Sequence, residues 1–543
     1  MPRTRTALRA TAAASVLLVA TACNAGTPAS PDPADALDFS DLAQDPPAGT
    51  GDAGTIHWNL PYEPLSLDPI KTFNYAENTA LANSCEALLR ANPDFTVGPG
   101  LAEKWDQPDP TTWVFHLRPG VTFWNGKPLT AEDVAWSIGR HLDPDSGSYV
   151  ATYLTNVASV TASGPLEVTM RMKKPDALLT QALASLGGIV TEKASSLAAG
   201  EDFGTPQHLP MCTGPFRLDS WKPGQAIELS RNDAYWDDAL KPLSSKLELS
   251  FVTDESTAVL ALESGELDGE FFYLPPAGLD KLRNGEDTEV VLGTSLAGWY
   301  LLGAASDGPF ADPDVRRALS MATDRAAIAS TVLQNTAIPA RSLATPASWT
   351  YGRSIFEKAY DELPGTDVDI EAATKLVEDS GVGDQPITIA VQGSSVVHEQ
   401  TANLLQAAGE AIGLHIEIKT IPVEQYGNVY VDPQARKGID AFLSTYYSVA
   451  DPLDSYLMFE KDAYNNYGRY DAIADQLVAA RSETDDETRA ELVAELEHRA
   501  VTDEAWLPLE YLPVILVQNK RITGSIATSN YLYYPWASAI GTR

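Results

Sequence analysis

Short apolar runs and longer segments of helical periodicity alternate along most of the chain. The runs at 386–391 and 415–421 predict strands, and the intervening segment 396–412 predicts an amphipathic helix. The apolar positions at helical spacing in that segment are Leu404, Leu405, Ala408 and Ile412. A strand, a helix and a second strand in this order indicate a βαβ unit.

Three further helices begin with recognisable capping signals. In each, a side chain at the predicted start can accept a hydrogen bond from a free backbone N–H of the first turn. These starts are Asp312 before Pro313, Thr130 with Asp133, and Thr484 with Glu487. No period of 20–50 residues repeats along the chain, which argues against a repeat protein. The alternation of strands and helices predicts a mixed α/β protein with more than one lobe.

The amino-terminal residues have the pattern of an export signal. Three arginines fall within the first ten residues, and residues 11–22 are uncharged and mostly small or apolar. This apolar run is too short to span a bilayer, and small residues precede Cys23, so we expect residues 1–22 to be a cleaved signal peptide. The Ala20-Thr21-Ala22-Cys23 sequence resembles the bacterial lipobox, although that motif more often has Leu at the position of Ala20. The resemblance implies lipid attachment at Cys23, whereas secretion without a lipid is the alternative.

The segment that follows the export signal has few large apolar residues. Residues 23–53 are rich in Ala, Pro, Gly and Asp, which predicts a flexible tether between an anchor and the folded body. Membrane attachment would then depend on the lipid alone.

Composition excludes several classes of partner. The chain has 543 residues and a formal net charge of −36. Such an acidic balance argues against nucleic acid and against a basic surface that docks on anionic lipid. A chain of this length exceeds what one hydrophobic core normally serves, so at least two domains are expected. Strongly anionic solutes should also be repelled on average.

The remaining cysteines, Cys85 and Cys212, would lie in an oxidising compartment. An even pair of this kind predicts a disulfide, and two separate buried thiols are the alternative.

A search for catalytic motifs finds none. The sequence lacks a G-x-S-x-G elbow, an H-E-x-x-H zinc motif, a P-loop and a dinucleotide-binding glycine pattern. Its seven histidines have no metal-ligand spacing. We therefore expect no enzyme activity, no cofactor and no metal, and an exported hydrolase is the competing hypothesis from another class.

Motifs spread along the chain carry a family resemblance. The longest is the run 113–123, followed by Asn125-Gly126 and by Ala131 to Ser137. Further matching pieces, in order, are 67–69, 86–88, 99–105, 213–216, 221–224, 232–236, 310–319, 324–325, 369–381, 451–452 and 508–509. Together they resemble the extracellular solute-binding proteins of family 5, the oligopeptide, dipeptide and nickel-type receptors of ABC importers.

The resemblance implies an α/β, two-lobed periplasmic-binding-protein-like fold (type II) with an extra subdomain in the first lobe. The expected first lobe combines 54–98, 206–294 and 508–543, the extra subdomain is 99–205, and the second lobe is 295–507. Chain crossings near 295 and 508 would form the hinge, and the lobes would close over a ligand. The implied partners are a peptide or small-molecule ligand and a heterodimeric permease with cytoplasmic ATPases, and the protein itself would be a monomer. A receptor that delivers its ligand to a sensor is a further alternative.

Candidate ligand-binding residues follow from the same resemblance and from aromatic and polar positions near the expected cleft. They are Asn74, Tyr75, Glu77, Thr213, Trp299, Tyr426, Tyr446, Tyr447, Ser448 and Asp451. Peptide receptors of the family usually have Asp, which receives the ligand's α-ammonium group, at the position of Ser448. A neutral hydroxyl cannot supply that charge-assisted contact. Peptide is therefore the leading ligand by family, and an oligosaccharide or another uncharged solute is the alternative.

Overall fold

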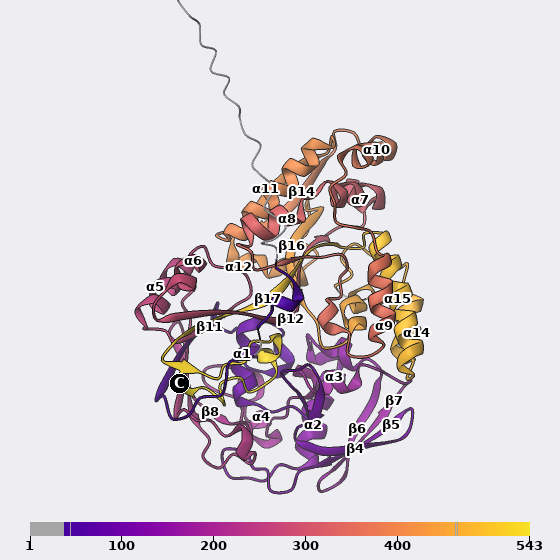
Figure 1. Cartoon of the computed structure of the whole chain (residues 1–543). Helices are drawn as coiled ribbons and strands as arrows, with labels where there is room; N and C mark the ends of the chain where they lie inside the picture. The colour runs from indigo at the N-terminus through magenta and orange to yellow at the C-terminus, as the bar shows by residue number, and fades with distance from the viewer. Residues whose placement is uncertain (1–36, 44, 462, 464) are drawn as a thin grey trace, which may run out of the picture.

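The computed structural model describes residues 37–43, 45–461, 463 and 465–543 (Figure 1). The predicted signal peptide 1–22 and the lipid-attachment residue Cys23 lie outside the described residues. Within the described part of the chain, we find no helix whose length and apolar character would let it cross a bilayer.

One mixed sheet runs through the middle of the molecule. In the described chain it has the strand order β15-β14-β16-β12-β17-β11-β1-β10-β9-β8, with β13 paired on β17. Its strands are β1 Thr55–Asn59, β8 Phe216–Lys222, β9 Ala226–Arg231, β10 Lys246–Ser250, β11 Gly269–Phe272, β12 Thr288–Gly303, β13 Ile338–Pro339, β14 Pro386–Gln392, β15 His415–Ile421, β16 Ala441–Tyr447 and β17 Leu507–Asn519. The predicted βαβ unit is confirmed, because β14 and β15 pair in parallel and α11 connects them.

The two long strands β12 and β17 lie at the centre of this sheet and pair with each other antiparallel. Their pairing is interrupted between Gly293 and Ala297, close to the crossing predicted at 295. At Gly293 there is no room for a side chain, since an added Cβ would lie 1.6 Å from the carbonyl oxygen of Ala527. The break therefore depends on a glycine.

A separate four-stranded sheet has the order β4-β5-β7-β6 and lies at the lower right of Figure 1. Its strands are β4 Ala102–Asp109, β5 Thr112–Leu117, β6 Val157–Gly164 and β7 Glu167–Met172. The short pairs are β2 Leu89–Ala91 with β3 Val97–Pro99, and β18 Ile522–Thr523 with β19 Gly541–Thr542.

Helices cover the sheets and connect their strands. They are α1 Tyr75–Ser84, α2 Ala131–Leu142, α3 Leu179–Leu183, α4 Lys193–Ala199, α5 Glu255–Ser264, α6 Leu279–Asn284, α7 Pro313–Ala322, α8 Arg325–Ala327, α9 Arg353–Glu362, α10 Ile370–Ser380, α11 Val396–Ala411, α12 Val423–Tyr426, α13 Asn428–Val431, α14 Ala474–Ser482 and α15 Asp486–Thr502. A 3₁₀ segment, Pro452–Phe459, follows β16 and is buried throughout.

Two of the three predicted helix starts are confirmed. Thr130 and Asp133 form the capping box of α2, and Asp312 caps α7 ahead of Pro313. The prediction that Thr484 caps the last long helix is wrong. Asp485 caps α15, because its carboxylate accepts from both the backbone N–H (3.0 Å) and the hydroxyl (2.8 Å) of Thr488.

The hydrophobic core is divided into several clusters. One, here called cluster A, draws on α1, the strands β1 and β8 to β11, and the chain from Val514 to Ile540. A second, cluster B, draws on residues 297–416, 441–443 and 507–512. A third packs α9, α14 and α15 against the 452–459 segment, and a fourth lies between the four-stranded sheet and α2. The strand β17 passes from cluster B to cluster A between Leu512 and Val514.

The carboxyl-terminal half of the predicted tether lies against the folded body. Phe39 packs on Tyr511 with ring centroids 5.7 Å apart, and Ala43 donates a backbone hydrogen bond to the carbonyl of Leu292. Asp45 then accepts a hydrogen bond from the backbone N–H of Ala527. Apolar side chains are sparse here, but backbone pairing compensates for them. Residues 37–43 and 45–53 therefore form a strap over the body, where composition predicted a free segment.

Candidate functional site

A small gap lies where clusters A and B meet. Its volume is about 20 Å³. The lining residues are all uncharged: Tyr75, Phe272, Tyr273, Ser295, Ala297, Tyr447, Leu512, Pro513, Val514, Ser529, Tyr531 and Leu532. They come from α1, from four strands of the main sheet and from the carboxyl-terminal segment. A gap of this size holds about one water molecule, so a larger ligand must part these walls to enter.

Tyrosine rings form the contact across this gap. Tyr75 of α1 stacks on Tyr273 with ring centroids 5.0 Å apart and an interplanar angle of 20°. Tyr447, at the end of β16, also packs on Tyr75, with ring centroids 5.0 Å apart and an interplanar angle of 54°. Burial raises the pKa of Tyr273 to about 12 and the pKa of Tyr447 well above its ordinary value. These phenols therefore stay neutral at physiological pH and offer aromatic faces together with hydroxyl groups.

The amino end of α1 holds two of the predicted binding residues. Asn74 caps the helix, and its side-chain oxygen accepts from the backbone N–H of Tyr75 (3.2 Å). Glu77 is buried in the first turn, where its carboxylate accepts from the backbone N–H of Leu65 (3.0 Å). Burial raises the pKa of Glu77 to about 7, so its charge changes near neutral pH.

Tyr447 contacts the α1 region across the gap, and Ser448 contacts the break in β12. The hydroxyl of Tyr447 accepts from the side-chain amide of Asn78 (2.8 Å) and donates to the backbone carbonyl of Phe73. Ser448 is buried, and its hydroxyl donates to the carbonyl of Leu296 (3.3 Å). The position where peptide receptors usually carry Asp therefore has a hydroxyl already bonded to the backbone.

Asp451 is fully buried and has partners of its own. Its carboxylate accepts from the Tyr351 hydroxyl (3.2 Å) and the backbone N–H of Leu453 (3.0 Å), and its other oxygen lies 3.5 Å from the Arg489 guanidinium. Burial raises its pKa to about 6, although Arg489 opposes the shift. Asp451 thus caps the 452–459 segment and pairs with an arginine, so its charge is compensated within the protein.

Three of the predicted aromatic residues lie away from the gap. Trp299 is fully buried in cluster B, with its indole N–H bonded to the Thr401 hydroxyl (3.3 Å). The hydroxyl of Tyr426 donates to the carbonyl of Leu443 (2.7 Å) beneath β16. Tyr446 packs against Trp506 at 6.0 Å. The structure therefore brings Tyr75 and Tyr447 to the lining of the gap, but not Asn74 or these three aromatics.

Thr213 and the cysteines form a structural cluster next to α1. Cys85 and Cys212 are joined in a disulfide, which confirms the predicted bridge. Thr213 is buried, and its hydroxyl donates to the Glu86 carboxylate (2.6 Å). The bridge therefore ties the end of α1 to the segment that leads into β8.

A buried ion cluster, which sequence reasoning missed, joins α14 to the segment before α3. The guanidinium of Arg481 lies 2.9 Å from Asp176 and 2.7 Å from Glu460. It also donates to the carbonyls of Thr152 (3.2 Å) and Tyr153 (3.1 Å). The side chains of Arg481 and Asp176 are each only 1% exposed, although 305 residues separate them in sequence. No local motif indicates such a pair.

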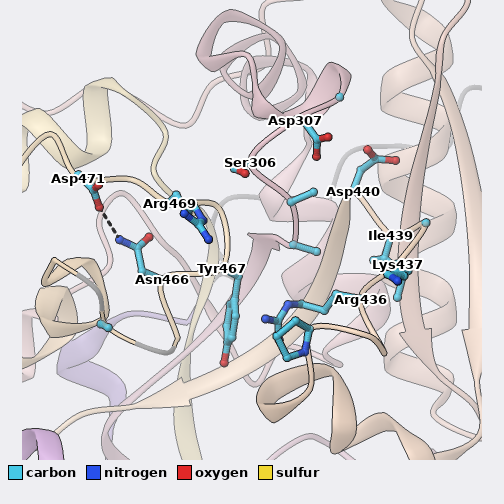
Figure 2. Close-up of a pocket in the computed structure, with 16 residues that line it drawn as sticks. Ser306, Asp307, Arg436, Lys437, Ile439, Asp440, Asn466, Tyr467, Arg469 and Asp471 are labelled. Carbon is cyan, nitrogen blue, oxygen red and sulfur yellow. Dashed lines mark hydrogen bonds between the residues drawn. The ribbon is translucent and has the colours of Figure 1, made fainter.

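A larger cavity of about 760 Å³ lies elsewhere, among the loops 304–308, 433–440 and 463–471 (Figure 2). Arg436 stacks over the Tyr467 ring at 4.7 Å on one side, and Asn466 bonds to Asp471 on another. Three acidic and three basic residues line it, namely Asp307, Asp440, Asp471, Arg436, Lys437 and Arg469, so its charge has no common sign. All of its lining residues come from one stretch of the chain, 304–471, so it does not lie between clusters A and B.

Comparisons with known proteins identify the family. Residues 96–467, more than half of the chain, match the family described as bacterial extracellular solute-binding proteins, family 5 (middle part). The periplasmic oligopeptide-binding protein OppA of Salmonella typhimurium is 27% identical over 492 residues, 86% of this chain and 89% of that protein. The dipeptide-binding protein DppE of Bacillus subtilis is 24% identical over 522 residues, 90% of this chain and 93% of that protein.

The fold agrees with this match. The oligopeptide-binding protein AppA of Bacillus subtilis, solved in complex with a nonapeptide, superimposes with a TM-score of 0.78 at 20% identity, covering 91% of this chain and 100% of that one. The predicted α/β periplasmic-binding-protein fold is confirmed. The chain therefore belongs to the bacterial extracellular solute-binding proteins of family 5, which bind solutes and are not enzymes.

Proposed function

We propose that this protein is the receptor of an ABC importer and captures peptides in the gap between clusters A and B. The observation that carries the proposal is the tyrosine-lined gap beside the paired strands β12 and β17, the two long strands that join the clusters. Names of relatives such as OppA and DppE support peptide as the solute. The proposed partner is a heterodimeric permease with cytoplasmic ATPases.

The proposed lobes follow the core clusters except at residues 508–512, where Leu509 and Leu512 still pack in cluster B. Residues 54–98, 206–294 and 508–543 form the first lobe around cluster A, and 99–205 forms the extra subdomain. Residues 295–507 form the second lobe. The break in β12 near Gly293 and the passage of β17 between clusters support a hinge at these two crossings. Tyr447 already contacts α1 in this structure, so opening about such a hinge would separate the two.

We also propose that Cys23 carries a lipid that holds the protein on the outer face of the membrane. The lipobox-like sequence at 20–23 supports this anchor. The test is a Cys23→Ser variant expressed in the native host. The proposal predicts that the wild type is labelled by radioactive palmitate and sediments with membranes, whereas the variant is unlabelled and released. Equal release of both proteins would leave ordinary secretion as the explanation.

The chemistry around Ser448 keeps an uncharged ligand as the second candidate. Ser448 is bonded to the Leu296 carbonyl, and Asp451 is compensated by Arg489. Neither residue therefore offers a free carboxylate to a ligand ammonium group. A peptide without that contact, or an oligosaccharide stacked on the tyrosines, fits the uncharged walls of the gap.

Thermal unfolding of the secreted domain in the presence of ligand libraries tests the proposal. A library of tri- to pentapeptides is compared with oligosaccharides, and any ligand present at 100 times its Kd should add about 2.7 kcal/mol to the free energy of unfolding. Mass spectrometry of the recovered ligand checks that it is unchanged. Stabilisation by peptides supports the proposal, stabilisation by sugars alone supports the second candidate, and cleavage of the peptide would contradict a pure receptor.

A further inference from the structure

The first turns of α1 hold a buried carboxamide with unused hydrogen-bonding capacity. The side chain of Asn78 is fully buried, and its amide nitrogen donates to the Tyr447 hydroxyl (2.8 Å). Its side-chain oxygen has no hydrogen-bond partner among the residues that the structure describes. Leaving a buried acceptor unpaired costs about 1–3 kcal/mol, so a partner for this oxygen would be stabilising.

Tyr447 contacts this carboxamide from across the gap. Its ring packs against both cluster A and cluster B, and its hydroxyl bonds to Asn78 and to the Phe73 carbonyl. A single hydroxyl thus satisfies one donor and one acceptor of the α1 region. It leaves the Asn78 oxygen unsatisfied, because a hydroxyl has only one proton, and here that proton goes to Phe73.

One residue of an extended peptide satisfies both atoms of such a carboxamide. In an extended chain, the N–H and C=O of the same residue point to the same side, as they do in the hydrogen-bonded pairs of an antiparallel sheet. The N–H would donate to the Asn78 oxygen and the C=O would accept from the Asn78 nitrogen. The Phe73 carbonyl, released by Tyr447, is a further acceptor for a ligand N–H.

We propose that Asn78 binds the backbone N–H and C=O of one extended residue of the ligand, and that the Tyr447 hydroxyl competes with the ligand for this place. The inference rests on the proposed capture of solute in this gap and names the peptide backbone as the group recognised there. Recognition of backbone atoms is independent of the ligand's side chains and does not need the ammonium contact that Ser448 cannot provide.

The two residues should respond to substitution in opposite directions. The probe is the tightest-binding member of the tri- to pentapeptide library, titrated calorimetrically. Tyr447→Phe keeps the ring but removes the competing hydroxyl, so we expect the Kd to fall about three- to tenfold. Asn78→Ala removes the recognising carboxamide, so we expect the Kd to rise about tenfold or more. Tyr426→Phe is the matched control, because its hydroxyl bonds to Leu443 away from the gap, and the Kd should not change.

Backbone methylation of the probe locates the contact. Each peptide N–H is methylated in turn, and one position should weaken binding about tenfold in the wild type but much less in Asn78→Ala. Weaker binding by Tyr447→Phe would overturn the competition and make the hydroxyl a ligand contact. An unchanged Kd in both variants, with peptide still bound, would overturn the site. If no peptide binds the wild type, the proposal that this protein captures peptides is wrong. That outcome is distinct from the two results that would overturn the competition or the site.

Discussion

Replacing Arg481 with methionine should prevent firm closure of the proposed lobes while leaving each lobe folded. The substitution keeps the apolar stem of the side chain but removes the guanidinium, so Asp176, whose side chain is 1% exposed, loses its cationic partner in the closed form. Removing one member of a buried ion pair costs about 3–5 kcal/mol. If the pair forms only on closing, the variant avoids this cost by staying open, where water solvates Asp176. Affinity for ligand should therefore fall by roughly two to three and a half orders of magnitude.

Calorimetric titration with the same peptide probe measures the effect, and small-angle scattering reports the shape. We expect a larger radius of gyration with peptide present than for the wild type. Without peptide the thermal midpoint should fall only modestly, because Glu460 of the same proposed lobe also loses its partner. Arg499→Met is the control, because Arg499 pairs with Asp503 at 2.6 Å but is 54% exposed. Exposed pairs contribute about 0–1 kcal/mol, so its affinity should change less than about fivefold.

A second substitution separates the lost charge pair from lost packing. Asp176→Asn in the Arg481→Met background removes the unpaired charge, while its side-chain oxygen can still accept from the backbone N–H of Leu178. Affinity should partly recover. The reasoning is refuted if Arg481→Met lowers thermal stability but leaves the Kd unchanged. That result would mean that Asp176 and Arg481 stay together when ligand enters.

Three further predictions concern stability. Phe39→Ala should lower the free energy of unfolding by about 1–2 kcal/mol in urea titration, because the half-buried ring packs on Tyr511; an unchanged value would mean that the strap contributes nothing. Replacing both Cys85 and Cys212 with Ala should lower the free energy of unfolding by about 4–5 kcal/mol, since the bridge closes a separation of 127 residues. A reducing agent should then lower the thermal midpoint of the wild type but not that of the variant. Burial raises the pKa of Glu497 from its ordinary 4.5 to about 7, so its contribution to stability is fully present below pH 4.5 and is lost as the pH rises through 7. Glu497→Gln should therefore raise the free energy of unfolding at pH 8.5 by up to about 3 kcal/mol and leave it nearly unchanged at pH 4, and a gain of equal size at both pH values would contradict this pKa.

Local sequence patterns predicted those parts of the fold that depend on neighbouring residues. The capping box at Thr130 and the βαβ unit around α11 each follow from hydrogen bonds or packing within a short segment. The prediction failed by one residue at Thr484 because Asp485, also a good cap, bonds to Thr488. Two adjacent capping residues compete, and Asp is on average the better cap of the two.

The candidate site was harder to predict because its chemistry arises from contacts between distant segments. Aromatic residues are common both in cores and in binding sites, so Trp299 and Tyr447 looked alike in sequence. Only the structure places Trp299 inside cluster B and Tyr447 at the gap. Asn78 had no sequence signal at all, because an Asn inside a helix has no periodic or spacing signature.

The contacts across the gap set the affinity through the free energy of closure. The hydroxyl of Tyr447 and the ion pair of Arg481 both connect the two proposed lobes, but a ligand affects these two contacts differently. On our proposals a ligand displaces the first contact and keeps the second. Strengthening a contact that remains in the complex favours the binding-competent closed form and raises affinity. Strengthening a contact that the ligand must break lowers affinity by the same free energy. The opposite effects on affinity expected for Tyr447→Phe and Arg481→Met therefore follow from one closure equilibrium. If both substitutions changed the affinity in the same direction, that equilibrium would not link the two residues.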